Sequence, residues 1–240
     1  SNTLGCCNPI EEIINLAHKK GSLVLLDACQ SLAHKPLDIN KLGVDFLAGS
    51  SHKLCGPTGI GFLWAREEIL RKIPPFLGGG EMIDEVYEDH STWADLPHKF
   101  EAGTPAIGEA IGMGAALNYL KSIGLEEINT YEKEITQYLF YKLKEINGIE
   151  ILGPSPKMQP ERGALATFFV EGIHSNDIAE LLDNSDICIR SGHHCCQPLH
   201  RFYGLKSTAR ASLSFITTKE EIDFLSDELQ SIISFIKRNS

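Results

Sequence analysis

Asp27 and Lys53 are the two residues whose types and spacing most clearly suggest chemistry. Asp27 ends the apolar run 23–26, which is typical of a buried parallel strand that presents a carboxylate at its edge. Lys53 follows in the polar loop 49–59. A carboxylate can keep a ring nitrogen protonated, and a lysine amine can form an exchangeable Schiff base. The pair could therefore hold a pyridine-ring cofactor, although a turn-capping aspartate and a solvated lysine would show the same spacing.

The residues around Lys53 favour a ligand that carries a phosphate. The run 50–52 supplies two hydroxyls and an imidazole directly before the lysine, and glycines follow at 56 and 59. Hydroxyl and imidazole groups can donate hydrogen bonds to a phosphate, and glycine lets the backbone approach a ligand closely. The loop therefore predicts an anion site beside the amine.

A second reactive group lies in the last quarter of the chain, where residues 190–196 read RSGHHCC and Arg210 follows. Two arginines near a thiol suit a substrate with a carboxylate, because a guanidinium can bind a carboxylate through two parallel hydrogen bonds. Positive surroundings also favour the thiolate of Cys195, which is the nucleophilic form. We therefore expect Arg210 to clamp a carboxylate and Cys195 to act as a nucleophile.

The same run offers an alternative, because its four residues His193, His194, Cys195 and Cys196 are all of types that bind zinc. Four consecutive residues cannot close a tetrahedral site, since zinc sites separate paired ligands by two or more residues. Further ligands would have to come from the other cysteines. We therefore expect no metal.

The composition is that of an ordinary globular protein. The 240 residues are 42% hydrophobic and carry a formal net charge of -10 without a basic run, which argues against a nucleic-acid partner. The apolar runs are too short to cross a bilayer, and the N-terminus carries no secretory signal. Seven cysteines, an odd number, favour a reducing compartment. We expect a cytoplasmic protein, or a plastid one if a transit peptide has been removed.

Hydrophobic periodicity predicts an α/β architecture in two parts. The first part should contain a helix capped by Asn8 and opened by Pro9, then strands, then an irregular functional surface at 76–104. Its strands are expected at 23–27, 44–48 and 60–65. Helices at 105–123 and 125–146 should lead into a small sheet with strands at 165–170, 187–190 and 209–216. Helices at 176–182 and 220–236 should pack on that sheet.

Several motifs in a fixed order resemble one known family. They read DACQ at 27–30, SSHK at 50–53, GPTG at 56–59, FEAGTP at 100–105 and RSGHHC at 190–195. Together they resemble the class V aminotransferase family of fold-type I pyridoxal-phosphate enzymes, and within it the SufS-like, group II cysteine desulfurases. The resemblance covers essentially the whole chain. It implies that residues 1–120 are the C-terminal part of a large cofactor domain with a mainly parallel sheet, and that residues 121–240 are a small α+β domain with the cysteine loop.

The resemblance also implies a role for each matching residue at the cofactor. Lys53 carries pyridoxal phosphate as a Schiff base, Asp27 pairs with the ring nitrogen, and Gln30 forms a hydrogen bond with the ring hydroxyl. Four further residues are expected at the phosphate, two of them across a homodimer: Ser50 and His52 of the same subunit, Gly103 and Thr104 of the other.

The implied reaction is that of a cysteine desulfurase. Arg190 and Arg210 bind L-cysteine, Cys195 takes its sulfur as a persulfide, and L-alanine is released. A SufE-type acceptor would then carry the sulfur to iron–sulfur cluster assembly. The family is longer, and its N-terminal region has no counterpart in these 240 residues. A selenocysteine lyase, a class V aminotransferase and an inactive fragment with a binding or scaffold role are the alternatives.

Overall fold

The computed structural model describes residues 1–239, which form two compact units. The N-terminal unit is Pro9–Leu125. The C-terminal unit consists of Ser1–Asn8 together with the chain from Glu126 onward. The first eight residues thus belong to the C-terminal unit, although no sequence pattern indicated this. The assignment of residues 1–120 and 121–240 to a cofactor domain and a small domain stays a prediction.

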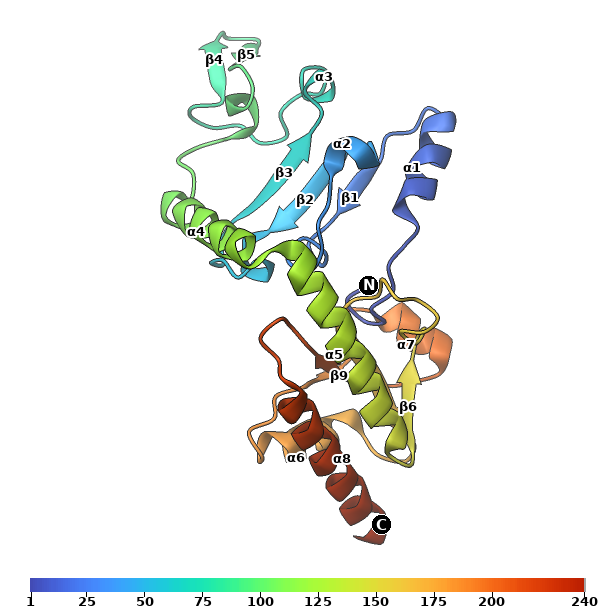
Figure 1. The fold of residues 1–240 in the computed structure, drawn as a ribbon. Coiled ribbons are helices and arrows are strands. Elements are labelled where there is room, and N and C mark those ends of the chain that lie inside the picture. The colour runs from blue at the N-terminus through green and yellow to red at the C-terminus, as the bar shows by residue number, and fades with distance from the viewer. Residues whose placement is uncertain (240) are drawn as a thin grey trace. The chain divides into compact units, whose positions relative to one another are not determined.

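A three-stranded sheet forms the centre of the N-terminal unit (Figure 1). Its strands, in spatial order, are β1 (Leu25–Asp27), β2 (Phe46–Ser50) and β3 (Gly61–Ala65). β1 and β2 are parallel, and β2 and β3 are antiparallel. The prediction that β1 is buried is wrong: Leu25 is 58% exposed, because β1 is an edge strand whose one partner in the described residues is β2. The predicted α/β class is confirmed.

Helices follow the predicted pattern in the N-terminal unit. α1 (Ile10–Lys19) is present as expected, but its N-cap is Pro9 and no side chain caps it, so the predicted cap at Asn8 is wrong. α4 (Ile107–Ile123) begins two residues later than the predicted helix at 105–123. The short elements are α2 (Ile39–Leu42), η1 (Ser51–Lys53), α3 (Glu67–Leu70) and η2 (His98–Phe100).

A hairpin interrupts the stretch 76–104, for which no regular structure was predicted. It pairs β4 (Ile83–Val86) with β5 (Ser91–Trp93) in antiparallel fashion. The prediction missed it because both strands are short and β4 is acidic and largely exposed, so the hydrophobicity of the segment does not alternate.

Asp45 ties several segments of the N-terminal unit together. Its buried Oδ2 accepts hydrogen bonds from the backbone N–H of Val24 and from Nε2 of His18, both at 2.8 Å. Nε of Arg66 lies 3.6 Å from Oδ1. Burial alone would raise the pKa of Asp45, but these hydrogen bonds and nearby charges hold the pKa below its usual value.

The C-terminal unit contains a four-stranded antiparallel sheet. The spatial order is β6 (Ile149–Leu152), β7 (Leu165–Val170), β9 (Thr208–Ser212) and β8 (Arg190–Gly192). β7 spans the predicted strand 165–170. β8 begins at the end of its predicted range and β9 is shorter than predicted, whereas β6 was not predicted.

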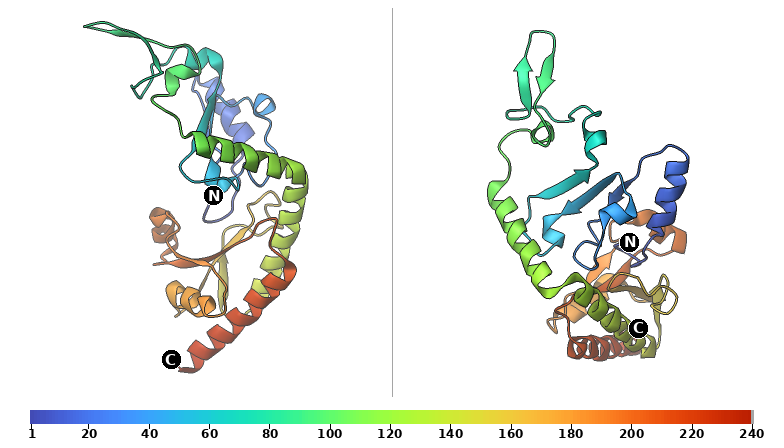
Figure 2. Two further views of the ribbon diagram at one scale, coloured as in Figure 1. Left: turned by 90° about the vertical axis from the view of Figure 1, so that its left-hand side faces the viewer. Right: turned by 45° about the horizontal axis from the view of Figure 1, so that its top comes forward.

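Helices α5 (Leu125–Glu145), α6 (Ser175–Asp183) and α8 (Lys219–Asn239) accompany this sheet, and Figure 2 shows them beside it. They share one apolar core with β7 and β9, in which Leu139, Phe168 and Leu229 are fully buried. The predicted helices are thereby confirmed. A shorter helix, α7 (Gln197–Tyr203), follows the cysteine loop. None of the described helices is long and apolar enough to cross a membrane.

Buried Arg162 attaches the first eight residues to the C-terminal unit. Its guanidinium donates hydrogen bonds to the carbonyls of Leu4 and Leu165, at 2.7 and 2.9 Å, and to that of Pro154. The N–H of Gly163 donates to the carbonyl of Gly5 at 2.7 Å. The segment 1–8 is therefore an integral part of this unit.

Candidate active site

Asp27 and Ser50 lie at the same edge of the N-terminal sheet. β1 and β2 run parallel with Asp27 opposite Ala48, so the carboxyl ends of both strands are adjacent. Ligands of open α/β sheets bind outside such ends. Gln30 follows in the turn directly after β1, with an exposed side chain. The structure thus places Asp27 at the carboxyl end of a strand, as its position after the apolar run indicated.

The carboxylate of Asp27 is ionised at neutral pH. Its Oδ1 accepts a hydrogen bond from the backbone N–H of Cys29 at 3.0 Å. This bond and a second one from the Cys29 side chain lower the pKa of Asp27, and the positive charge of Lys53 lowers it further. A permanently anionic, exposed carboxylate at this edge fits a protonated ring nitrogen, as the expected cofactor requires.

Lys53 is presented on a tight turn between β2 and β3. The carbonyl of Ser51 accepts the backbone N–H groups of Leu54 and Gly56, at 2.8 and 3.0 Å, which closes the turn. Ser50 Oγ and His52 Nδ1 form a hydrogen bond of 2.9 Å at its beginning. Lys53 and His52 are exposed. An accessible amine beside a hydroxyl and an imidazole fits the aldehyde and phosphate of pyridoxal phosphate.

Gly103 and Thr104 lie in the connection between η2 and α4. Gly103 has a positive φ of 80°, and its N–H already donates to the carbonyl of Gly80 at 2.9 Å. Thr104 is exposed, so its hydroxyl is accessible to another molecule. The expected role of this pair at a partner subunit's phosphate stays a prediction, with Thr104 as its available donor.

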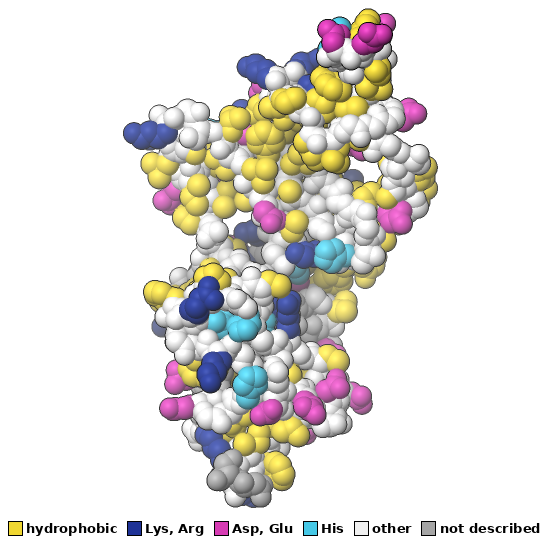
Figure 3. Space-filling model, turned by 180° about the vertical axis from the view of Figure 1, so that it is seen from behind, with side chains coloured by type: hydrophobic (Ala, Val, Ile, Leu, Met, Phe, Trp, Pro, Cys, Tyr) yellow, Lys and Arg dark blue, Asp and Glu magenta, His cyan; other side chains and the backbone are white. Residues whose placement is uncertain are grey.

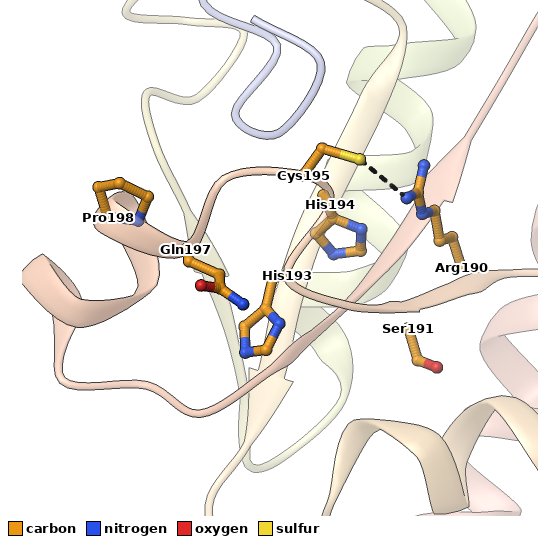
Figure 4. Close-up of a pocket in the computed structure, with 7 residues that line it drawn as sticks. All are labelled: Arg190, Ser191, His193, His194, Cys195, Gln197 and Pro198. Atoms are coloured by element: carbon orange, nitrogen blue, oxygen red, sulfur yellow. Dashed lines mark hydrogen bonds between the residues drawn. The ribbon is translucent and has the colours of Figure 1, made fainter.

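In the C-terminal unit, the strand register brings the two arginines together. Arg190 of β8 lies directly opposite Arg210 of β9, so both side chains are on the same face of the sheet. Nη2 of Arg190 donates to Sγ of the exposed Cys195 at 3.4 Å (Figure 4). Partial burial lowers the pKa of Arg210, and the charge of Arg190 lowers it further. The arginines and the thiol therefore form one cationic cluster.

A cavity of about 490 Å³ opens beside this cluster. Arg190, His193 and Cys195 line it, as Figure 4 shows, and its lining contains no acidic side chain. On the face drawn in Figure 3, arginine or lysine side chains lie next to histidine side chains. The lining of this cavity therefore has a positive side chain, Arg190, and no negative one, although the chain carries a net charge of -10. Such a cavity suits a small anionic substrate.

Two consecutive residues of the cysteine loop have left-handed backbone conformations, with φ of 50° at His194 and 59° at Cys195. Non-glycine residues rarely adopt this region, so surrounding contacts must hold the loop. Asn2 supplies one of them, because its Nδ2 donates to the carbonyl of His194 at 2.7 Å. The carbonyl of Asn2 also accepts from Nη1 of Arg210 at 2.6 Å. Asn2 therefore links the cysteine loop to the arginine.

The chain is similar to known proteins over nearly its whole length. The family model for class-V aminotransferases matches residues 1–225. The chain belongs to the class-V aminotransferase family. A probable cysteine desulfurase of Synechocystis is 56% identical over 235 residues, which are 98% of this chain and 56% of that protein.

Two solved structures of this family's fold are similar as well. Cysteine desulfurase CsdA of Escherichia coli is matched with a TM-score of 0.91 and 34% identity, over 98% of this chain and 57% of that one. A mutant of C-DES, with glycine covalently linked to its pyridoxal-phosphate cofactor, is matched with a TM-score of 0.79 and 27% identity, over 95% of this chain and 57% of that one. The chain spans about half the length of the curated relatives it matches.

In this member of the class-V aminotransferase family, the predicted site residues fall into groups. The N-terminal unit contains the residues expected at the cofactor: Asp27, Gln30, Ser50, His52, Lys53, Gly103 and Thr104. Arg190, Cys195 and Arg210 belong to the C-terminal unit. Among residues 1–239, no three histidine, cysteine or acidic side chains are grouped so that they could hold a metal ion together.

Sequence reasoning missed Asn2, and it did not distinguish His194 from its neighbours. Asn2 binds a backbone carbonyl 192 positions away, a contact that no local pattern indicates. His194 is buried whereas His193 is exposed. Consecutive residues in a loop carry no periodicity from which such a difference could be predicted.

Proposed function

We propose that the protein is a pyridoxal-phosphate-dependent cysteine desulfurase, which converts L-cysteine to L-alanine and takes the sulfur on Cys195 as a persulfide. One observation carries the proposal: the exposed Cys195 thiol accepts a hydrogen bond from Arg190 and lies in a cationic cluster with Arg210. An aminotransferase would need the arginines but not the thiol. The similarity to proteins that are named cysteine desulfurases supports the same choice.

Residues of the N-terminal unit would hold the cofactor. Lys53 provides the amine for its aldehyde, the anionic Asp27 pairs with its ring nitrogen, and Gln30 bonds its ring hydroxyl. Ser50 and His52 supply donors for its phosphate. When bound, pyridoxal phosphate withdraws electrons from the bonds around the α-carbon of the amino acid. The lowered pKa of Asp27 favours this, because the carboxylate stays charged at neutral pH.

The other steps belong to the side chains of this chain. Arg210 binds the substrate carboxylate, and Lys53 moves the α-proton. The Cys195 thiolate, which Arg190 stabilises, attacks the substrate sulfur, so an S–S bond forms as the carbon–sulfur bond breaks. The electron pair of the broken bond goes to the substrate carbon, which takes a proton and becomes the methyl group of alanine.

Two partners complete the proposal. A homodimer would bring Thr104 and Gly103 of one subunit to the cofactor phosphate of the other. Exposed apolar side chains on α4, such as Ile107 and Ile111 at 58% and 71% exposure, are compatible with such contact. A SufE-type protein would accept the persulfide sulfur for iron–sulfur cluster assembly, and the exposure of Cys195 supports direct transfer.

The decisive experiment separates the cofactor role from the thiol role. The protein is incubated with pyridoxal phosphate and reduced with borohydride, and peptide mapping should find the fixed cofactor on Lys53. A second sample receives the cofactor and L-cysteine and is analysed by mass spectrometry without reductant. Cys195 should carry one additional sulfur atom. Cys195→Ser should abolish it, whereas Cys188→Ser, which removes another exposed thiol of the same unit, should not.

Each alternative gives a different result. Conversion of L-cysteine that persists in Cys195→Ser would indicate an aminotransferase. Release of selenium from selenocysteine that is faster than release of sulfur from cysteine would indicate a selenocysteine lyase. No cofactor on Lys53 in any sample would favour a binding or scaffold role and would refute the proposal.

A further inference from the structure

Thr208 of β9 lies where that strand, the cysteine loop and helix α7 meet in the C-terminal unit. Its Oγ1 lies 3.0 Å from Nε2 of His194 and 2.9 Å from Nε2 of His200. All three side chains are buried, with exposed fractions of 0% for Thr208, 1% for His194 and 3% for His200. We propose that Thr208 is a positioning residue for Cys195: its hydroxyl fixes the proton positions of both histidines and thereby holds the loop that presents the thiol.

The hydrogen-bond partners determine where each proton lies. Nδ1 of His200 is 2.9 Å from the carbonyl of Cys196, which only accepts, so Nδ1 carries the proton. In the neutral ring Nε2 is then an acceptor, and the Thr208 hydroxyl donates to it. The hydroxyl has one proton, so towards His194 its oxygen must accept. His194 is therefore the Nε2–H tautomer and donates to Thr208.

This arrangement has one direction only. Nδ1 of His194 is buried and has no hydrogen-bond partner among the described residues. If the Thr208 hydroxyl instead donated to His194, the Nε2 of His194 would be an acceptor and its proton would lie on Nδ1. No acceptor for Nδ1 is present among the described residues. A second proton on the ring would face the same difficulty and the charges of Arg190 and Arg210. Burial, these two arginines and His200 together lower the pKa of His194 to about 4, so the ring is neutral at pH 7.

Thr208 also holds the ends of the loop through its backbone and through His200. Its backbone lies opposite Gly192, the last residue of β8, in the β8–β9 register. At the other end, His200 of α7 bonds the carbonyl of Cys196. Residues 193–196 thus lie between Gly192, which pairs with Thr208 in the sheet, and the contact of His200 with the Cys196 carbonyl, in which Thr208 orients the ring. Two left-handed residues within that span need such anchoring, because their backbone conformation is unfavourable by itself.

The hydroxyl can be tested apart from the shape of the side chain. Thr208→Val keeps the branched shape but removes the donor and acceptor, whereas Thr208→Ser keeps the hydroxyl. The readout is the rate at which iodoacetamide alkylates Cys195, measured by peptide mass spectrometry in a Cys196→Ser background. Cys188 is an exposed thiol of the same unit and serves as the internal reference. Nitrogen-15 NMR of the imidazoles reports the tautomers directly.

Thr208→Val removes the hydrogen bonds to both histidines, of which the one to His194 reaches the loop directly. We expect the loss of that bond to lower the Cys195 to Cys188 rate ratio by about twofold to tenfold and to change the His194 tautomer signal. Thr208→Ser should keep both the rate ratio and the tautomer signal of the wild type. An unchanged ratio and tautomer in Thr208→Val would overturn the proposal. Equal changes at both thiols would also overturn it, because they indicate general loosening, as would a serine variant that behaves like valine.

The inference rests on the proposed role of Cys195 as sulfur acceptor, but its test does not. Alkylation requires neither cofactor nor cysteine turnover. A protein that shows the expected alkylation pattern but forms no persulfide would refute the proposed function and leave the positioning role of Thr208 intact.

Discussion

Replacing His194 with glutamine should remove a specific part of the pH dependence of folding. The ring is buried, and its pKa in the folded protein is about 4, compared with 6.5 for an ordinary histidine. Between pH 6.5 and about pH 4, His194 is protonated in the unfolded chain but stays neutral in the folded protein. The contribution is therefore fully favourable above about pH 6.5 and is lost as the pH falls towards 4.

The magnitude follows from the two pKa values. Where only the unfolded state is protonated, the free energy of unfolding falls by about 1.4 kcal/mol for each pH unit. Over the interval from 6.5 to about 4, this amounts to about 3 kcal/mol. That is a large share of the 5–15 kcal/mol that roughly describes ordinary domains. The groups that face His194 and could modify this value are His200, Arg190 and Arg210.

The assay is urea unfolding at several pH values between 7.5 and 4.5, followed by far-UV circular dichroism. The long helices α5 and α8 belong to the C-terminal unit, whereas both tryptophans, Trp64 and Trp93, belong to the N-terminal unit. Tryptophan fluorescence therefore identifies the transition of the other unit. The difference between wild type and His194→Gln isolates the histidine, because all other groups titrate in both proteins. Glutamine can place its amide near the former Nε2 and so preserve the bond to Thr208.

His193→Gln is the matched control, because His193 is the exposed neighbour of His194. It should keep the wild-type slope. The reasoning is refuted if His194→Gln retains the full wild-type slope between pH 6.5 and 4.5, or if His193→Gln loses it. The first result would mean that the ring of His194 accepts a proton in the folded state as readily as in the unfolded chain. The second would assign the slope to His193 instead.

Two further substitutions test hydrogen bonds inside each unit, one in the N-terminal and one in the C-terminal unit. Asp45→Asn should lower the free energy of unfolding of the N-terminal unit by about 1–3 kcal/mol, because hydrogen bonds to a charged acceptor become bonds to a neutral one; urea unfolding by tryptophan fluorescence measures it. Arg162→Met should leave three carbonyls without their donor and release the segment 1–8. Hydrogen–deuterium exchange of that segment should then rise severalfold, while peptides of the N-terminal unit stay unchanged.

The elements that sequence predicted well are long or strongly apolar. α5, α8 and β7 each bury a regular set of side chains in the common core, so the local pattern reports the tertiary environment directly. The sequence did not predict β6 or the hairpin β4–β5, because these strands are short and partly exposed. The exposure of β1 could not be predicted from its apolar residues, since burial of a strand depends on its neighbours rather than on its own sequence.

The same distinction applies to the candidate site. Asp27, Lys53 and Cys195 were candidates from the sequence alone because their reactive side chains lie in short motifs of suitable chemistry. Asn2 and Thr208 were not, because they act on groups far away along the chain or on a ring whose burial the loop sequence does not reveal. Their common feature is that they fix a conformation rather than supply a reactive group.

Strand β9 contributes to both the apolar core and the candidate site, with different residues on its two faces. Side chains alternate along a strand, so Thr208, Arg210 and Ser212 lie on one face and Ala209 and Ala211 on the other. Both alanines are buried in the apolar core, whereas the first face carries Thr208, which bonds His194, and Arg210, which bonds Asn2. A register slip by one residue would exchange the faces, placing Arg210 in the core and alanines at the site. The core therefore enforces the register that sets Arg210 opposite Arg190, so packing far from the thiol determines the charge around it.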